Sequence, residues 1–208
     1  MYFLDLLGTL AFAITGAFKA KKGKLSLFGV IFLGIITAVG GGTVRDLIIN
    51  RTPLFYLIDS NYLFVAILGS IITFLAPTFF KKRLSIFRFI DSIGLATFSI
   101  IGVSVTYNYI FADTLLQITS FLSCVLLGMV TAFAGGVIRD AVMGDTPFAF
   151  KTGSNYALSS FLGASVFYLL MFYSLNLAIA LSIITAIFMR EIVSKYGMYR
   201  KVLKGKAL

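Results

Sequence analysis

Two Arg-Asp pairs, Arg45-Asp46 and Arg139-Asp140, lie inside long apolar segments, where fixed charges are rare. A charge held at the centre of a bilayer costs several kcal/mol, so such residues pair with one another or face water. Neighbouring helix positions are about 100° apart, so one member of each pair can face a polar pathway while the other binds an adjacent helix. The alternative is an ion pair at a helix end that reaches the membrane surface.

A cluster of small residues precedes each pair, and the clusters are Gly40, Gly41 and Gly42 in the first segment and Ala134, Gly135 and Gly136 in the second. Glycine costs roughly 1 kcal/mol per helical position relative to alanine, so consecutive glycines favour a kink or a break. Freed backbone groups at membrane depth are tolerated only in a protein interior or a wet cavity. We therefore expect broken, cavity-lining helices. Close helix packing through small residues is the alternative interpretation.

The composition indicates an integral membrane protein. The 208 residues are 59% hydrophobic and 12% charged, and the mean hydropathy is +0.99. With no His and with Cys124 as the single cysteine, the usual ligands of zinc and copper are missing. The formal charge of +10 comes from short loops between apolar runs, which is typical of membrane topology rather than of nucleic-acid binding. We find no motif of an enzyme and expect no cofactor.

The apolar runs predict seven transmembrane helices, because about 20 apolar residues cross the hydrocarbon core. We expect them at residues 2–18, 26–50, 61–80, 88–110, 115–144, 155–174 and 176–194. The first run lacks a basic segment before it, so we interpret it as a retained helix rather than a secretion signal. Seven spans put the basic loops at 19–24, 81–88 and 195–208, together with Lys151, on one side. The positive-inside rule then predicts a cytoplasmic carboxyl terminus and an amino terminus outside the cell membrane.

The chain also carries an internal repeat. The Thr-Ala-x-x-Gly-Gly-x-x-Arg-Asp pattern of residues 37–46 recurs at 131–140, and Asp5 and Asp91 open the first helix of each half. We expect a single transmembrane domain with one repeat over 1–80, a second over 87–174, a seventh helix over 176–194 and a basic tail over 195–208. Because each half has an odd number of spans, the second half must be inverted, as in many transporters and some channels.

This doubled glycine and Arg-Asp pattern in three plus three plus one helices resembles the trimeric intracellular cation channels, in particular their prokaryotic members. The resemblance implies a homotrimer in a lipid membrane, with one pore per subunit that conducts potassium and, less well, sodium. It further implies that the second and fifth helices kink at the glycine clusters and line the pore. The residues expected to line or gate it are Thr43, Arg45, Asp46, Arg139 and Asp140, with Asp5, Asp91, Thr37 and Thr131 as further candidates.

A secondary transporter of a small zwitterion such as glycine is the alternative function. In that case the helix N-terminus after Gly42 would hold the substrate carboxylate, and Asp46 would hold its amine.

The one-sided basic loops give a testable topology. A tag after residue 208 should be accessible only from the cytoplasm, and a tag before Met1 only from outside. Accessibility of both tags from the same side, measured with a membrane-impermeant reagent on intact and opened cells, would contradict the seven-span topology and the inverted repeat.

Overall fold

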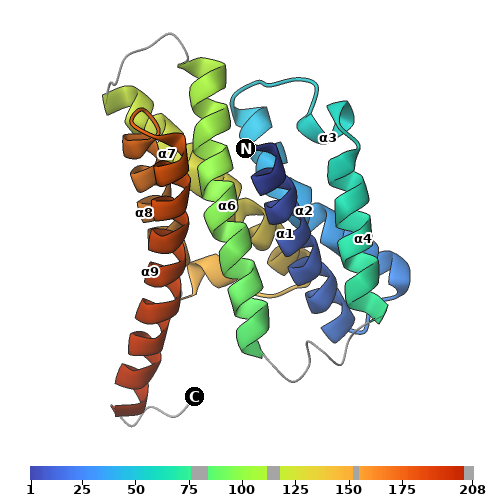
Figure 1. Ribbon diagram of the computed structural model, residues 1–208. Coiled ribbons are helices and arrows are strands. Elements are labelled where there is room, and N and C mark those ends of the chain that lie inside the picture. Colours follow the sequence, from blue (N-terminus) through green and yellow to red (C-terminus); the bar gives the residue numbers. More distant parts are fainter. Residues whose placement is uncertain (76–83, 112–117, 152–154, 204–208) are drawn as a thin grey trace.

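The computed structural model describes residues 1–75, 84–111, 118–151 and 155–203, and nearly all of them are helical (Figure 1). The all-helical class is therefore confirmed. The elements are α1 (Tyr2–Lys22), α2 (Leu27–Ile48), α3 (Phe55–Ile58), α4 (Asn61–Leu75), α6 (Leu84–Ile110), α7 (Ile118–Val142), the 3-10 turn η1 (Phe148–Phe150), α8 (Tyr156–Leu170) and α9 (Leu175–Leu203).

Within the described residues, four helices are long and apolar enough to cross a membrane: α1, α2, residues 86–110 of α6, and α7. The apolar helices α4 and α8 have 15 residues each, a length of about 22 Å at 1.5 Å per residue. Parts of several predicted segments lie outside the described part of the chain: residues 76–80 and 115–117 of two spans, 81–83 of a basic loop and 204–208 of the tail.

Four predicted helix ends are wrong by four residues or more. Helix α6 begins at Leu84 instead of residue 88, and α8 ends at Leu170 instead of residue 174. Helix α1 continues to Lys22 instead of ending at residue 18, and Gly23 then donates its N–H to the Lys19 carbonyl. Lysine is a good helix former, and its long stem lets the ammonium reach water from a helical backbone. Helix α9 continues to Leu203, so much of the tail predicted after residue 194 is helical.

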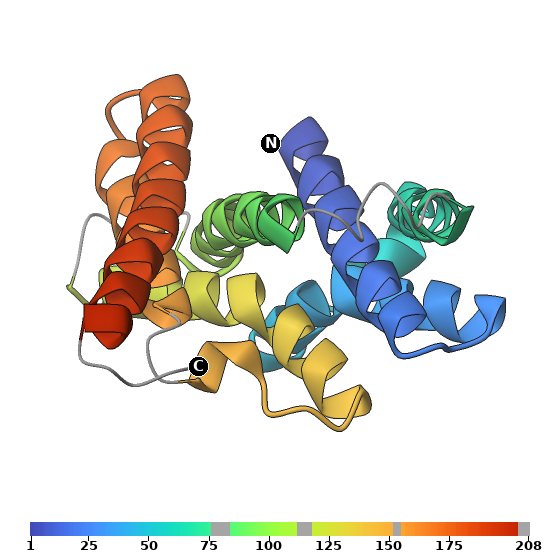
Figure 2. The ribbon, with the colours of Figure 1, turned by 90° about the horizontal axis from the view of Figure 1, so that it is seen from below.

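The helices form two groups that meet along α2 and α7 and along α1 and α6. Seen from below, α1, α2 and α4 lie on one side, α8 and α9 lie on the other, and α6 and α7 run between them (Figure 2). The start of α1 and the carboxyl end of α9 are at opposite ends of the bundle (Figure 1). This placement agrees with an odd number of long helices.

Helices α2 and α7 cross in close backbone contact at the glycine clusters. A Cβ atom on Gly41 would overlap the Thr131 carbonyl oxygen, and a Cβ atom on Gly135 would overlap the Thr37 carbonyl oxygen. Both helices are continuous through the clusters, so the expectation of a helix break is wrong. The small residues allow two intact helices to approach, which keeps their backbone hydrogen bonds satisfied. A bend within the continuous helices stays a prediction.

These contacts are reciprocal. Thr37 corresponds to Thr131 and Gly41 to Gly135 in the sequence pattern, and each threonine lies against the glycine of the other half. The same exchange occurs between α1 and α6, where Gly8 faces Phe98 and Gly94 faces Phe12. Such a set of contacts is what an inverted duplication about a two-fold axis would produce.

The crossing predicts which glycines tolerate a methyl group. Gly41→Ala and Gly135→Ala should each destabilise the protein by about 1–3 kcal/mol, because the new Cβ meets a backbone oxygen that cannot move aside. Gly136→Ala is the matched control, since its Cβ would lie 3.3 Å from the Tyr156 hydroxyl and meet no backbone atom. Thermal unfolding in detergent should show a lower Tm for the first two variants and little change for the third. Equal Tm values for all three would contradict the crossing.

Candidate functional site

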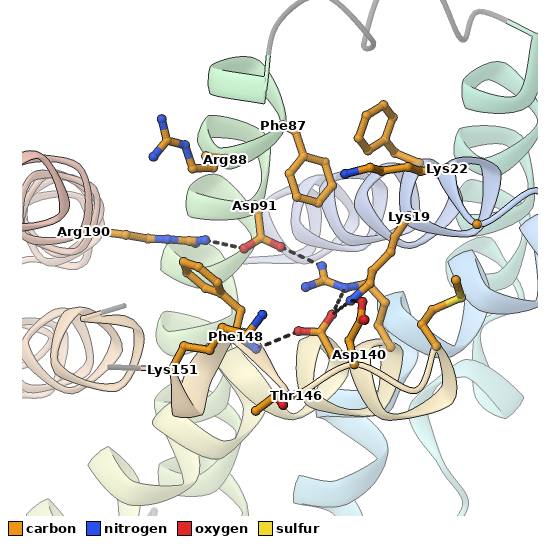
Figure 3. Close-up of a pocket in the computed structure, with 15 residues that line it drawn as sticks. Lys19, Lys22, Phe87, Arg88, Asp91, Asp140, Thr146, Phe148, Lys151 and Arg190 are labelled. Atoms are coloured by element: carbon orange, nitrogen blue, oxygen red, sulfur yellow. Dashed lines mark hydrogen bonds and ion pairs between the residues drawn. The ribbon is translucent and has the colours of Figure 1, made fainter. Parts of the chain in front are cut away.

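A cavity of about 520 Å³ opens at the end of the bundle where α1 ends and α6 begins (Figure 3). We call it the basic cavity. Its lining includes six basic and three acidic side chains: Lys19, Lys22, Arg88, Arg139, Lys151 and Arg190, with Asp91, Asp140 and Asp145. Lys22, Arg88 and Lys151 are exposed and make no ion pair within the described residues.

A chain of buried charges runs along one wall of the basic cavity. Arg139 donates from Nε to Asp140 Oδ1 over 2.9 Å and from Nη1 to Asp91 Oδ1 over 3.0 Å. The Tyr156 hydroxyl donates to Asp91 Oδ2 over 3.0 Å, and Arg190 of α9 donates to the same oxygen. Figure 3 shows Asp91 pointing into the cavity with Arg190 reaching it from the side. Arg139 therefore links α7 to the fixed carboxylate of α6.

Lys19 connects this charge chain to the cavity entrance. Its ammonium lies 2.7 Å from Asp140 Oδ1 and 2.8 Å from Asp145 Oδ2. The hydrogen bond and the positive charge of Lys19 lower the pKa of Asp145, which lies in the loop after α7. Asp140 also accepts a hydrogen bond from the Phe148 backbone N–H over 2.8 Å. Asp140 thus ties together α1, α7 and η1.

A smaller cavity of about 200 Å³ lies at the opposite end, and Asp5, Arg45, Arg51 and Tyr62 are among its lining residues. The Tyr62 hydroxyl donates to Asp5 Oδ2 over 2.9 Å. This pair repeats the Tyr156–Asp91 pair of the other half. Arg45 donates from Nε to Asp46 Oδ1 over 2.9 Å, which repeats the Arg139–Asp140 contact.

The four predicted Arg-Asp residues are all buried. The exposed fractions are 3% for Arg45, 0% for Asp46, 4% for Arg139 and 3% for Asp140. The interpretation as ion pairs exposed at a membrane surface is therefore wrong, because each carboxylate and guanidinium is enclosed by neighbouring helices. Burial raises the cost of leaving either member unpaired. Asp46 Oδ2 is a buried atom without a hydrogen-bond partner in the described residues.

The predicted threonines and glycines do not line either cavity. The hydroxyls of Thr37, Thr43 and Thr131 donate to the carbonyl oxygen four residues earlier on their own helix, over 2.6, 2.9 and 2.6 Å. Each of these hydroxyls is therefore hydrogen-bonded within its own helix, α2 or α7. The glycine clusters lie at the helix crossing, with Asp5 and Asp91 on the cavities at either end. The structure thus separates the glycine contacts from the charged cavities.

Sequence reasoning missed Arg190, Lys19, Tyr62 and Tyr156 as site residues. Lys19 and Arg190 were counted only among the basic residues of the loops. The tyrosines occupy equivalent positions in the repeat, and that match was a usable signal for a paired role. No group of three or more potential metal ligands occurs among the described residues.

The comparison with known proteins identifies the family. The family model described as "Glycine transporter" matches residues 2–78 and 88–172. A UPF0126 membrane protein of Vibrio cholerae is 34% identical over 189 residues, which cover 90% of this chain and 72% of that protein. The UPF0126 inner membrane protein YadS of Escherichia coli K12 is 36% identical over 80% of this chain and 76% of its own length.

Solved structures give the same answer. A TRIC trimeric intracellular cation channel orthologue from Rhodobacter sphaeroides has a TM-score of 0.84 and 27% identity, over 94% of this chain and 97% of that one. A structure described as "Structural basis for conductance through TRIC cation channels" has a TM-score of 0.80 and 30% identity, over 95% and 94%. These relatives are membrane proteins and ion channels, not enzymes. The predicted resemblance is confirmed, and the chain belongs to the UPF0126 membrane protein family as a prokaryotic member of the trimeric intracellular cation channel family.

Proposed function

We propose that this protein is a potassium-preferring channel for monovalent cations, with a pore inside each subunit between α2 and α7. The observation that carries the proposal is the likeness of nearly the whole chain to solved TRIC cation channels, at TM-scores of 0.80 to 0.84. Identities of 27 to 30% support a shared function as well as a shared fold.

The proposed assembly is a homotrimer in the cell membrane. Each subunit would have seven spans: an inverted pair of three-helix repeats followed by α9. The reciprocal glycine contacts and the matching Tyr-Asp pairs support the inverted repeat. So does the match of the family model to two separate segments, 2–78 and 88–172. The basic cavity would face the cytoplasm, since it collects Lys19, Lys22, Arg88 and Lys151.

The proposed pathway joins the two cavities through the crossing of α2 and α7. Each cavity is lined by an aspartate that accepts a hydrogen bond from a tyrosine, the half-buried Asp5 at one end and the buried Asp91 at the other. Carboxylate oxygens can replace part of the hydration shell of a permeant cation. At the crossing, the contact of Gly41 and Gly135 with opposite backbones leaves the helices close together. Conduction would require these two helices to move apart.

The transporter alternative is favoured by one feature. The basic cavity presents buried carboxylates and free cationic side chains within a single space of about 520 Å³, which suits a zwitterion with one charge of each sign. The sequence suggested that a helix N-terminus after Gly42 would hold the substrate carboxylate, but α2 is continuous there. A zwitterion bound in the basic cavity would not need that helix N-terminus. The two functions differ in whether flux needs an organic substrate.

Flux into proteoliposomes separates the two functions. The purified trimer should carry potassium at a rate that rises with the gradient and does not depend on an added amino acid. Electrical recording should show discrete potassium currents. Saturable uptake of radiolabelled glycine without such currents would favour the transporter and overturn the channel.

The buried aspartates should govern cation preference. In Asp140→Asn, the side chain can still accept the Phe148 N–H, and Arg139 keeps its bond to Asp91, so folding should survive. Loss of a fixed negative charge near a low-dielectric passage raises the energy of a cation there by on the order of a few kcal/mol. The reversal potential in a potassium chloride gradient should therefore move toward zero, and Asp46→Asn should act in the same direction.

Asp145→Asn is the matched control for Asp140→Asn. Asp145 also contacts Lys19, but its side chain is 57% exposed, so salt screens its charge. Its variant should keep the reversal potential of the original protein at high salt. Unchanged reversal potentials in both Asp46→Asn and Asp140→Asn would contradict a pore beside these residues.

A further inference from the structure

The equivalent aspartates of the two halves, Asp5 and Asp91, have different partners. Asp5 accepts a hydrogen bond from Tyr62 and makes no ion pair within the described residues. Asp91 accepts the equivalent bond from Tyr156 and in addition pairs with Arg139 and Arg190. The extra guanidinium of Arg190 comes from α9, which lies outside the repeat and has no counterpart in the first half.

Asp91 does not need Arg190 to be satisfied. Its Oδ1 already accepts from Arg139 and its Oδ2 from Tyr156, each over 3.0 Å. Arg190 in turn is poorly satisfied: it is 5% exposed, and its Nη1 is a buried atom without a hydrogen-bond partner in the described residues. A buried donor left unpaired is destabilising. Stability alone therefore does not explain why this arginine points inward.

The surroundings of the Arg190 guanidinium have the features of a cation-binding site. The carboxylate of Asp91 lies on one side, and the ring of Tyr156 lies 4.3 Å from the guanidinium carbon on another. A carboxylate and an aromatic face together bind cations in general, not only arginine. The site opens on the basic cavity, which Arg190 lines (Figure 3). The protein's own side chain thus occupies a position that a cation from the cavity could take.

We propose that Arg190 is a tethered cation that blocks the cytoplasmic entrance of the pathway by occupying the site formed by Asp91 and Tyr156. This inference rests on the proposed channel function and on the cytoplasmic placement of the basic cavity. A permeant cation entering from that side competes with the guanidinium for the same carboxylate and is repelled by its charge. Withdrawal of Arg190 with α9 frees Asp91 Oδ2 to contact a cation in the cavity. At the outer end Arg45 and Arg51 line the cavity, but both pair with Asp46 and neither forms an ion pair with Asp5 among the described residues, so the block acts from one side.

Removal of the Arg190 charge tests the block. Arg190→Gln should increase potassium current several-fold, mostly for ions that enter from the basic cavity, so the current–voltage relation becomes more symmetric than that of the original protein. Arg190→Lys, which keeps a charge at the site, should stay near the original protein. Arg88→Gln is the control: it removes one positive charge from the same cavity, but Arg88 is exposed and makes no ion pair within the described residues, so its effect should be small and should vanish at high salt. Equal behaviour of Arg190→Gln and Arg88→Gln would overturn the proposal.

Rescue by free guanidinium tests occupancy directly. In Arg190→Gly, millimolar guanidinium chloride on the basic-cavity side should restore the low current, whereas the same concentration of sodium chloride should not. Guanidinium should also raise the Tm of Arg190→Gly and leave that of Arg190→Gly with Asp91→Asn unchanged. If Arg190→Gly does not fold, the same additions are made to Arg190→Gln, which fills more of the space.

The outcomes separate the two proposals. Potassium current that is insensitive to Arg190 variants and to guanidinium overturns the block and leaves the channel intact. Absence of potassium current in the original protein and in every variant overturns the channel, while the Tm response still decides whether Asp91 and Tyr156 form a cation site. Guanidinium that raises the Tm of all variants equally overturns that site.

Discussion

The close crossing of α2 and α7 is the constraint on which the rest of the structure depends. Gly41 against the Thr131 backbone and Gly135 against the Thr37 backbone bring two intact helices together at the middle of the bundle. About one turn past the crossing, each helix places an Arg-Asp pair near an opposite end of the bundle. In lipid the close approach of backbones replaces the hydrophobic effect as the source of helix association. The two cavities are separated by the same contact that holds the halves together.

Ion pairs and hydrogen bonds to buried carboxylates then hold the helices together at each end of the bundle. The carboxylates Asp46 and Asp140 each bind the adjacent arginine, and Asp140 also binds Lys19 and the backbone of η1. Buried charges of this kind are destabilising unless several partners satisfy them. The network therefore couples α1, α6, α7 and α9 at the basic end. A displacement of one helix there must be accompanied by the exchange of ion-pair partners, and such exchanges separate discrete states in other proteins.

The halves are alike in backbone contacts and differ in electrostatics. The Tyr62–Asp5 and Tyr156–Asp91 pairs have nearly the same geometry, 2.9 and 3.0 Å. The basic end adds Arg190 and Lys19, and its cavity is the larger, about 520 Å³ against about 200 Å³. Arg190 of α9 and Lys19 of α1 thus make the two cavities unequal. In the proposed pathway the energy of a cation would differ at the two ends, so the current would differ between the two directions.

The sequence by itself determined the membrane class, most helix positions, the duplicated pattern and the Arg-Asp residues of the site, because apolar runs and charges within them are local signals. It also predicted the family correctly. It did not determine whether the glycines break their helices or let two intact helices pack closely, since both outcomes have the same local composition. In the structure, Gly41 and Gly135 each lie against the backbone of the opposite helix, and both helices are continuous. Arg190 looked like one more basic residue near a helix end. Only the tertiary structure, by packing α9 beside α6, brought its guanidinium to Asp91, because an ion pair across 99 residues depends on helix placement and leaves no mark in local sequence.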